Sequence, residues 1–193
     1  RQAWYGCACC PSQISRFLPS IGNYIYGTSD KALWVNLFIG NTTEVTIDGK
    51  KVVMKQETDY PWDGLVKLTV TSEQPLGKEL RIRIPGWCKS YTLSVNGNKV
   101  DSTTDKGYTV IKEWKTGDLI VLNMDMPVEK VSADPRVRQN TGKRALQRGP
   151  LVYCLEETDN AKDFADLALT PTSSFEVKDE PDNLGGIRSI KAI

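Results

Sequence analysis

Histidine is absent from the 193 residues of this chain. Its absence removes the side chain that most often acts as a general base, and also the one that most often binds metal ions in proteins. Catalysis or metal binding by this chain must therefore depend on cysteine, carboxylate, lysine or tyrosine side chains.

The chain also lacks a surplus of charge and a long apolar run. Lys and Arg together number 25 and Asp and Glu 24, so the net charge is +1 and we expect no nucleic-acid partner. No apolar stretch approaches the roughly 20 residues that cross a bilayer, so we expect no membrane partner either. The sequence opens at Arg1 without an initiator methionine or a signal peptide, and we expect further residues to precede it.

The five cysteines are not spaced like a disulfide framework. Their number is odd and three of them lie within four positions, the full set being Cys7, Cys9, Cys10, Cys88 and Cys154. Disulfide-rich domains usually spread their cysteines along the chain, whereas a cluster favours a thiol site. The cluster is the strongest chemical signal in the sequence.

The residues that follow the cluster predict a helix over residues 11–26. Pro11 suits the first turn of this helix, and Gly27 suits the position after its end. Pro19 lies inside and should kink the helix, because proline has no N–H group and crowds the preceding turn. Apolar residues recur at helical spacing and define one face: Ile14, Phe17, Leu18, Ile21 and Ile25.

From about residue 32 the periodicity changes from helical to alternating. The turns Asp48-Gly49 and Asn96-Gly97 each predict a tight hairpin, because both residues of such a turn tolerate positive φ. We therefore predict a mainly β chain in which residues 32–131 form an antiparallel β-sandwich. The expected strands include 45–47, 52–54, 66–70, 80–84, 91–95, 108–111, 119–122 and 128–131.

The residues after Asp134-Pro135 predict a second, partial β unit. Strands are expected at 143–147 and 151–155, and a short helix at 161–167, while the remainder is polar and rich in turn residues. Few apolar residues are left for a separate core. The expected domains are a helical segment over 1–27, a sandwich over 28–133 and an incomplete β-rich domain over 134–193.

Three interpretations of the cysteine cluster remain open on its residues alone. Cys9 and Cys10 directly precede the expected helix, and helix N-termini stabilise thiolates, so one of them could be a nucleophile. Adjacent thiolates could also bind a metal ion, for which zinc is the first candidate. In the third interpretation the cysteines are small buried apolar residues.

The other reactive or aromatic residues favour structural roles. Cys88 and Cys154 lie in strand patterns, and we interpret them as core residues. The turn at residues 60–64, Tyr-Pro-Trp-Asp-Gly, and Trp87 could stack on a sugar ring, but packing at a sandwich end or between domains is the commoner use of such residues. Arg81 and Arg83 alternate with apolar residues, which predicts a solvated or interdomain face.

Several stretches of this chain resemble one known family. The segment GCACCPSQISRFLPSIGNYIY is similar to the Cys-x-Cys-Cys-Pro signature of the bacterial β-L-arabinofuranosidases of glycoside hydrolase family 127, formerly a domain of unknown function. The resemblance continues through LWVNLFIGNTTEVTI, QETDYPWDG, LRIRIPGW and GKRALQRGPLVYCLEETDN, and so covers at least residues 1–160. The cysteine segment and RALQRGPLVYCLE are its most specific parts.

The resemblance implies a fold and a set of roles. In that family an (α/α)6 barrel holds the active site and β-sandwich domains follow it, so residues 1–27 would be the end of the barrel. Cys9 would be the nucleophile of a retaining reaction and a zinc ligand. Cys10 would bind the same zinc ion, and Cys7 would lie nearby without binding it.

The same resemblance implies what this chain should lack. The family's acid/base glutamate and its two remaining zinc ligands, a glutamate and a cysteine, lie upstream of the signature. We therefore expect this chain to be an inactive C-terminal fragment of an enzyme that removes β-linked L-arabinofuranose from plant glycans, with the barrel as its partner in cis. A bacterial periplasm or cytoplasm would suit reduced thiols equally.

Two alternatives to an enzyme fragment remain. A non-catalytic carbohydrate-binding or structural sandwich would need only the aromatic turns and would leave the thiols unused. A small zinc-binding interaction domain would need a second pair of cysteine or histidine ligands to complete its site, and the sequence offers none.

Overall fold

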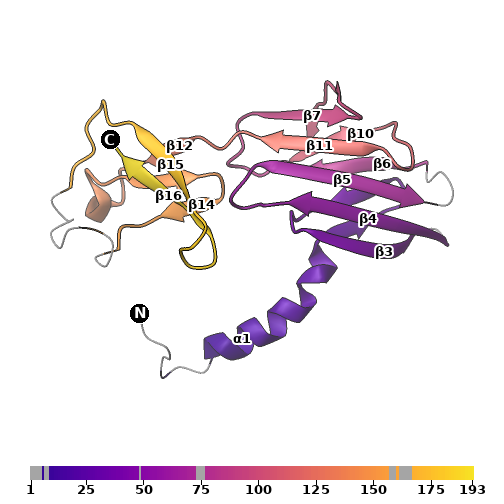
Figure 1. Ribbon diagram of the computed structural model, residues 1–193, viewed down its shortest axis with the longest axis horizontal. Coiled ribbons are helices and arrows are strands. Elements are labelled where there is room, and N and C mark those ends of the chain that lie inside the picture. The colour runs from indigo at the N-terminus through magenta and orange to yellow at the C-terminus, as the bar shows by residue number, and fades with distance from the viewer. Residues whose placement is uncertain (1–5, 7–8, 48, 73–76, 157–159, 161–166) are drawn as a thin grey trace.

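A computed structural model describes residues 6, 9–47, 49–72, 77–156, 160 and 167–193. In it a helical segment precedes two stacked β-sheets, and two smaller sheets follow them (Figure 1). The chain is mainly β, as the alternating sequence pattern predicts. Among these residues no helix has the length and apolar character needed to cross a membrane.

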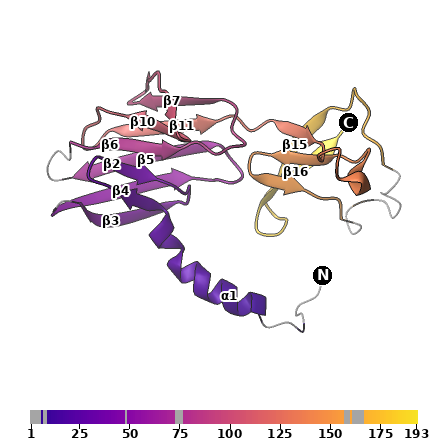
Figure 2. The same ribbon diagram turned by 180° about the vertical axis from the view of Figure 1, so that it is seen from behind.

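The helical segment changes type in the middle, next to Pro19. An α-helix, α1 (Cys9–Phe17), is continued by a 3-10 helix, η1 (Leu18–Tyr24). The sequence predicted a kink at Pro19, and the structure instead changes helix type beside it, where proline cannot donate to the preceding turn. Gly27 does not end the helix as predicted, because it lies in strand β1 (Tyr26–Thr28) opposite Trp34. The segment extends away from the sheets in both views (Figures 1 and 2).

The sandwich consists of a five-stranded and a six-stranded sheet. The first, in the order β1-β2-β6-β10-β9, contains β2 (Ala32–Val35), β6 (Glu79–Arg83), β9 (Thr104–Asp105) and β10 (Tyr108–Ile111). The second, in the order β3-β4-β5-β11-β7-β8, contains β3 (Asn41–Ile47), β4 (Lys50–Thr58), β5 (Leu65–Ser72), β7 (Tyr91–Val95), β8 (Asn98–Lys99) and β11 (Leu119–Met124).

The alternation of apolar and polar residues produces one core between the two sheets. On β5, Val66, Leu68 and Val70 are fully buried, whereas Lys67 between them is exposed. Strands of the opposite sheet contribute to the same cluster, for example Leu33 on β2 and Ile82 on β6. β3 pairs with β4 and β7 with β8 as antiparallel neighbours, and Asn96 and Gly97 both have positive φ, as predicted for a tight turn. Gly49 also has positive φ, while Asp48, the other residue of the first predicted turn, lies outside the described residues.

One strand pair departs from the predicted antiparallel arrangement. β2 and β6 run parallel, with Leu33 opposite Leu80. Between them the chain crosses to the other sheet, forms β3, β4 and β5, and returns, so no hairpin fixes the direction of β6 relative to β2. The sandwich is therefore mixed at this one pair, while the remaining pairs are antiparallel.

Residues 128–193, here named the C-terminal unit, form the two smaller sheets. β12 (Val128–Val131), β13 (Ala145–Arg148) and β14 (Leu151–Tyr153) make a three-stranded sheet, and the short 3-10 helix η2 (Arg138–Asn140) lies between the first two strands. β15 (Phe175–Glu180) and β16 (Ile187–Ala192) form a hairpin.

The C-terminal unit differs from the sequence prediction in one strand and contains one hairpin that was not predicted. Val128–Val131 was predicted to belong to the sandwich, but both edges of β11 are already paired with β5 and β7, and β12 pairs with β13 instead. The last hairpin was not predicted, because residues 175–192 are too polar to show a clear apolar alternation. The helix expected at 161–167 falls almost entirely outside the described residues.

Gly64 provides a test of the sandwich packing. A Cβ at this position would lie 2.0 Å from the carbonyl oxygen of Met124, because the backbones of the turn and of β11 are in contact there. Gly64→Ala should lower the free energy of unfolding by about 3 kcal/mol, measured by urea denaturation.

Gly86→Ala is the matched control for Gly64→Ala. A Cβ at Gly86 would meet no atom within 4 Å, and its φ is not positive. The control should change the stability by less than about 1 kcal/mol. Equal effects of the two substitutions would contradict the close packing at Gly64.

Candidate functional site

The two cysteines predicted to carry chemistry lie together at the start of α1. Cys9 and Cys10 are its first two residues, and their Sγ atoms are 3.9 Å apart. Both side chains are exposed, so the structure of this chain does not support the interpretation of buried apolar residues. Cys7, the third member of the cluster, lies outside the described residues.

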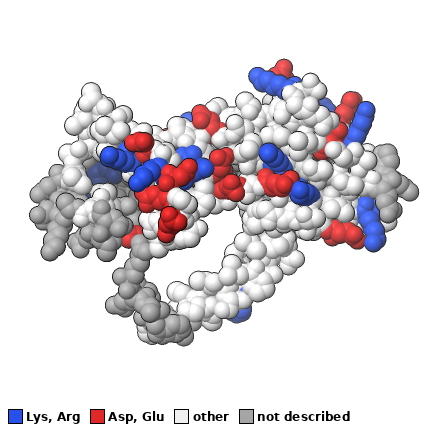
Figure 3. All heavy atoms as spheres, in the orientation of Figure 1, with Lys and Arg blue, Asp and Glu red and all other residues white. Residues whose placement is uncertain are grey.

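The helix that presents these thiols carries little charge. Across α1 and η1 the one charged residue is Arg16, and this segment is almost uniformly white in the space-filling view (Figure 3). Ser12 and Ser15 donate to backbone oxygens of the first turn, those of Cys9 and Pro11, at 2.9 and 2.8 Å. No residue of α1 is buried, and Ile14 and Phe17 are more than half exposed.

The separation of the two thiols fits a shared zinc ion. Tetrahedral geometry with Zn–S bonds of about 2.3 Å places two sulfur ligands about 3.8 Å apart, close to the observed 3.9 Å. Two sulfur atoms supply half of a tetrahedral shell. Within the part of the chain that the structure describes, no group of three or more cysteine, aspartate and glutamate side chains could complete it.

The two remaining cysteines differ from each other in burial. Cys88 packs against the sandwich core, donates to the carbonyl oxygen of Ser90 at 3.2 Å, and has a thiol pKa raised by burial. Its position agrees with the predicted structural role. Cys154 is exposed just beyond β14, so its assignment to a core was wrong. The C-terminal unit has too little buried volume to enclose the side chain.

The aromatic side chains of the two turns pack on one another. The ring of Tyr60 contacts Phe38 edge-on at 5.4 Å between centroids and stacks with Trp87 at 6.4 Å. A hollow of about 120 Å³ beside Trp87 is smaller than the few hundred Å³ typical of small-molecule pockets. These contacts agree with the predicted packing role rather than with sugar stacking.

Arg81 lies on the outer face of the sandwich, as predicted. Its guanidinium is 5.0 Å from the centroid of the Trp34 ring and donates to Glu79 and Asp105. Arg83 is exposed on the same strand. Acidic and basic side chains also alternate over the face drawn in Figure 3, so neither sign dominates there.

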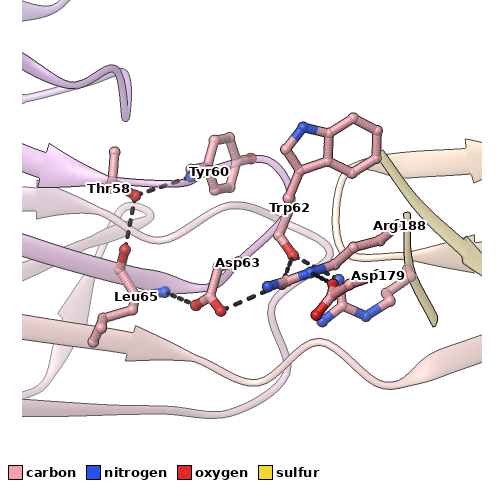
Figure 4. Close-up of polar contacts among 8 residues, drawn as sticks. Thr58, Tyr60, Trp62, Asp63, Leu65, Asp179 and Arg188 are labelled. Carbon is pink, nitrogen blue, oxygen red and sulfur yellow. Dashed lines mark hydrogen bonds and ion pairs between the residues drawn. The ribbon is translucent and has the colours of Figure 1, made fainter. Parts of the chain in front are cut away.

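A set of charged contacts missed by sequence reasoning joins the sandwich to the C-terminal unit. The carbonyl oxygen of Trp62 accepts a hydrogen bond from Arg148 at 2.8 Å. It also accepts one from Arg188 (Figure 4). Arg188 also pairs with Asp63 at 3.3 Å and with Asp179 at 2.6 Å. Trp62, Asp63, Arg148, Asp179 and Arg188 are named the junction cluster below.

The carboxylate of Asp63 has two roles in this cluster. One oxygen accepts the backbone N–H of Leu65 at 2.7 Å and the other faces Arg188. The Leu65 N–H group, followed by the Arg188 guanidinium, holds the pKa of Asp63 below its usual value, against the opposing effect of partial burial. The ionised form of Asp63 therefore stabilises the folded state.

Comparison with known proteins agrees with this arrangement of domains. Residues 32–126 match the model of the beta-L-arabinofuranosidase GH127 middle domain, and residues 128–192 match that of the glycoside hydrolase family 127 C-terminal domain. The chain thus contains the middle and C-terminal domains that these two models describe. It belongs to glycoside hydrolase family 127, since the two domain models together cover most of its length.

The most informative relatives are much longer than this chain. A non-reducing end beta-L-arabinofuranosidase of Bifidobacterium longum is 37% identical, over 98% of this chain but 30% of its own length. The crystal structure of a GH127 beta-L-arabinofuranosidase from Geobacillus stearothermophilus T6 matches 98% of this chain and 30% of that chain, at 48% identity and a TM-score of 0.91. A GH127 beta-arabinofuranosidase structure matches all of this chain and 33% of its own, at 38% identity and a TM-score of 0.92.

The lowered pKa of Asp63 predicts a specific pH dependence of stability. A carboxyl whose pKa is depressed by folding contributes stability above its ordinary pKa of 3.8, and this contribution is lost as the pH falls through the folded-state pKa. The difference in free energy of unfolding between the wild type and Asp63→Asn should therefore shrink as the pH is lowered from about 6 towards about 2.

The control for this prediction is Asp182→Asn, in the exposed turn between β15 and β16. Its difference from the wild type should be small over the same pH range, as measured by urea denaturation. A difference between wild type and Asp63→Asn that stayed constant with pH would show that ionised Asp63 does not stabilise the fold.

Proposed function

We propose that this chain is the C-terminal, β-rich part of a retaining β-L-arabinofuranosidase, in which Cys9 is the nucleophile and Cys9 and Cys10 hold a zinc ion. The observation that carries the proposal is the exposed thiol pair, 3.9 Å apart at the start of α1. The substrate class follows from the relatives of B. longum and G. stearothermophilus, which are beta-L-arabinofuranosidases.

The proposed reaction has two displacements. The Cys9 sulfur attacks the anomeric carbon, a carbon–sulfur bond forms, and the bond from that carbon to the departing oxygen breaks. The departing oxygen takes a proton from a carboxylic acid. Water, deprotonated by the same carboxylate, then displaces the sulfur and releases arabinose with its configuration retained.

The thiolate form of Cys9 is essential to this chemistry. A zinc ion, when bound, keeps its coordinated thiols deprotonated at neutral pH. Cys10 would add a second sulfur ligand and orient the first turn of the helix. The two missing zinc ligands and the acid/base carboxylate would come from the part of the enzyme that relatives have beyond the span of this chain.

The geometry gives less support to a carbohydrate-binding module as the function. That alternative depends on aromatic rings open to a sugar face, and Tyr60 and Trp87 instead stack on one another. The exposed cysteines would also have no role in it.

The isolated 193-residue chain should hydrolyse no β-L-arabinofuranoside and should retain little zinc. It offers two thiolates where a closed zinc site has four protein ligands. Turnover of p-nitrophenyl β-L-arabinofuranoside and elemental analysis after dialysis against a chelator are the two measurements. Turnover by the isolated chain that Cys9→Ser abolishes, or one tightly held zinc ion per chain, would contradict the proposal that the remaining zinc ligands and the acid/base lie outside this chain.

In the longer enzyme the two cysteines should differ in their effects. Cys9→Ser should abolish turnover, because serine keeps its proton at neutral pH, whereas Cys10→Ser should lower both the zinc content and the rate. Cys88→Ser, in the sandwich, is the matched control and should leave zinc content and rate near the wild-type values. If Cys9→Ser kept the rate within about tenfold, equivalent to ~1.4 kcal/mol of barrier, Cys9 would not be the nucleophile.

A further inference from the structure

The junction cluster joins three separate sheets at one backbone oxygen. Trp62 lies in the turn between β4 and β5 of the sandwich, Arg148 ends β13, and Arg188 lies in β16. Both guanidinium groups donate to the carbonyl oxygen of Trp62, from residues 86 and 126 positions away in sequence. The three-stranded sheet and the last hairpin are therefore both hydrogen-bonded to the same point of the sandwich. Figure 4 shows the contact made by Arg188.

Two cations that share one acceptor repel each other, so such an arrangement requires nearby negative charge. Asp63 and Asp179 supply it from opposite sides of the junction, one from the sandwich turn and one from β15. The side chain of Arg188 is 24% exposed, and those of Asp63 and Asp179 are 42% and 73% exposed, so the pair with Asp63 is the more shielded of the two from solvent. Removing Arg188 would leave two carboxylates without this partner.

The C-terminal unit has almost no hydrophobic core of its own. Of its described residues only Gly149 is buried, whereas Val152 and Leu155 are 70% and 50% exposed. Ordering a residue costs about 1–2 kcal/mol of backbone entropy, which small domains offset mainly by apolar burial. With so little burial, the stability of this unit must depend strongly on contacts with the sandwich.

Two further contacts link the described residues of the two units. Gly149 faces Met126, and a Cβ on the glycine would be 3.0 Å from the methionine sulfur. The ammonium group of Lys89 also forms an ion pair with Glu129 of β12. Lys89 is exposed, so this pair contributes little, and the arginines of the junction cluster are the main polar attachment.

We propose that the junction cluster attaches the C-terminal unit to the sandwich. The sheets of this unit stay folded because Arg148 and Arg188 bind Trp62 and Asp63. The C-terminal unit is not stable by itself. It stays folded while its arginines are bound to the sandwich turn at residues 60–64. The sandwich, with its own core, does not depend on the two arginines of the cluster. Loss of the arginines should therefore release the C-terminal unit selectively.

Hydrogen exchange of the intact 193-residue chain tests this proposal. In Arg188→Met, backbone amides of β13, β14, β15 and β16 should exchange at least tenfold faster than in the wild type. Amides of β4, β5 and β11 should stay within about twofold, because the core between the sheets is unchanged. Arg148→Met should act in the same direction on the same four strands.

Arg136→Met is the matched control within the C-terminal unit. Arg136 is 90% exposed and pairs with Asp134 two residues away, so its loss should leave exchange unchanged throughout. If Arg188→Met fails to fold, Arg188→Lys, which keeps the charge, is measured in its place. It should accelerate exchange in the same four strands, but by a smaller factor. Unchanged exchange in β13–β16, or equal acceleration in β5 and β11, would overturn the proposal.

Discussion

The apolar interface between the two sandwich sheets is the constraint on which the rest of the structure depends. Side chains such as Leu68, Leu80 and Leu122 are fully removed from water there, and each such burial contributes about 1.5–3 kcal/mol. Because the strands cannot shift by one residue without exposing these side chains, the register of both sheets is fixed. The turns at the sandwich ends, including residues 60–64, are positioned as a consequence.

The two ends of the chain are stabilised differently from its centre. At one end α1 and η1 carry exposed apolar residues, among them Ile14, Phe17 and Leu18, which gain nothing from the described fold. At the other end the C-terminal unit is attached through arginines and carboxylates rather than through an apolar core. The sandwich is thus the packed centre to which the thiol-bearing helix and the C-terminal unit are connected.

Three of the stretches that carried the family resemblance are in contact in the folded chain. Tyr60 of QETDYPWDG stacks with Trp87 of LRIRIPGW, and Trp62 accepts a hydrogen bond from Arg148 of RALQRGPLVYCLE. Neither contact places these residues beside the thiols in this chain. Their motifs therefore have a structural explanation, the attachment of one sheet to another, that is separate from the chemistry proposed for Cys9.

The sequence by itself determined the local features of this protein. Alternating residues predicted most sandwich strands, Asn96-Gly97 predicted its turn, and Cys9 and Cys10 were expected before a helix that Pro19 disturbs. These features depend on periodicity and on the φ preferences of single residues, which neighbouring sequence alone specifies. The zinc-binding and catalytic roles of the cysteines came from family resemblance and not from such local rules.

Only the tertiary structure decided which segments met. The parallel pairing of β2 with β6, the transfer of β12 to the C-terminal unit and the exposure of Cys154 depend on which strand edges and surfaces are already occupied. The contact of Arg188 with Trp62, 126 residues away, has the same origin. The sequence around an arginine does not indicate which backbone oxygen it will bind, because such a hydrogen bond requires only that the two groups lie close together. In this protein the packing of the core decides which groups lie close together.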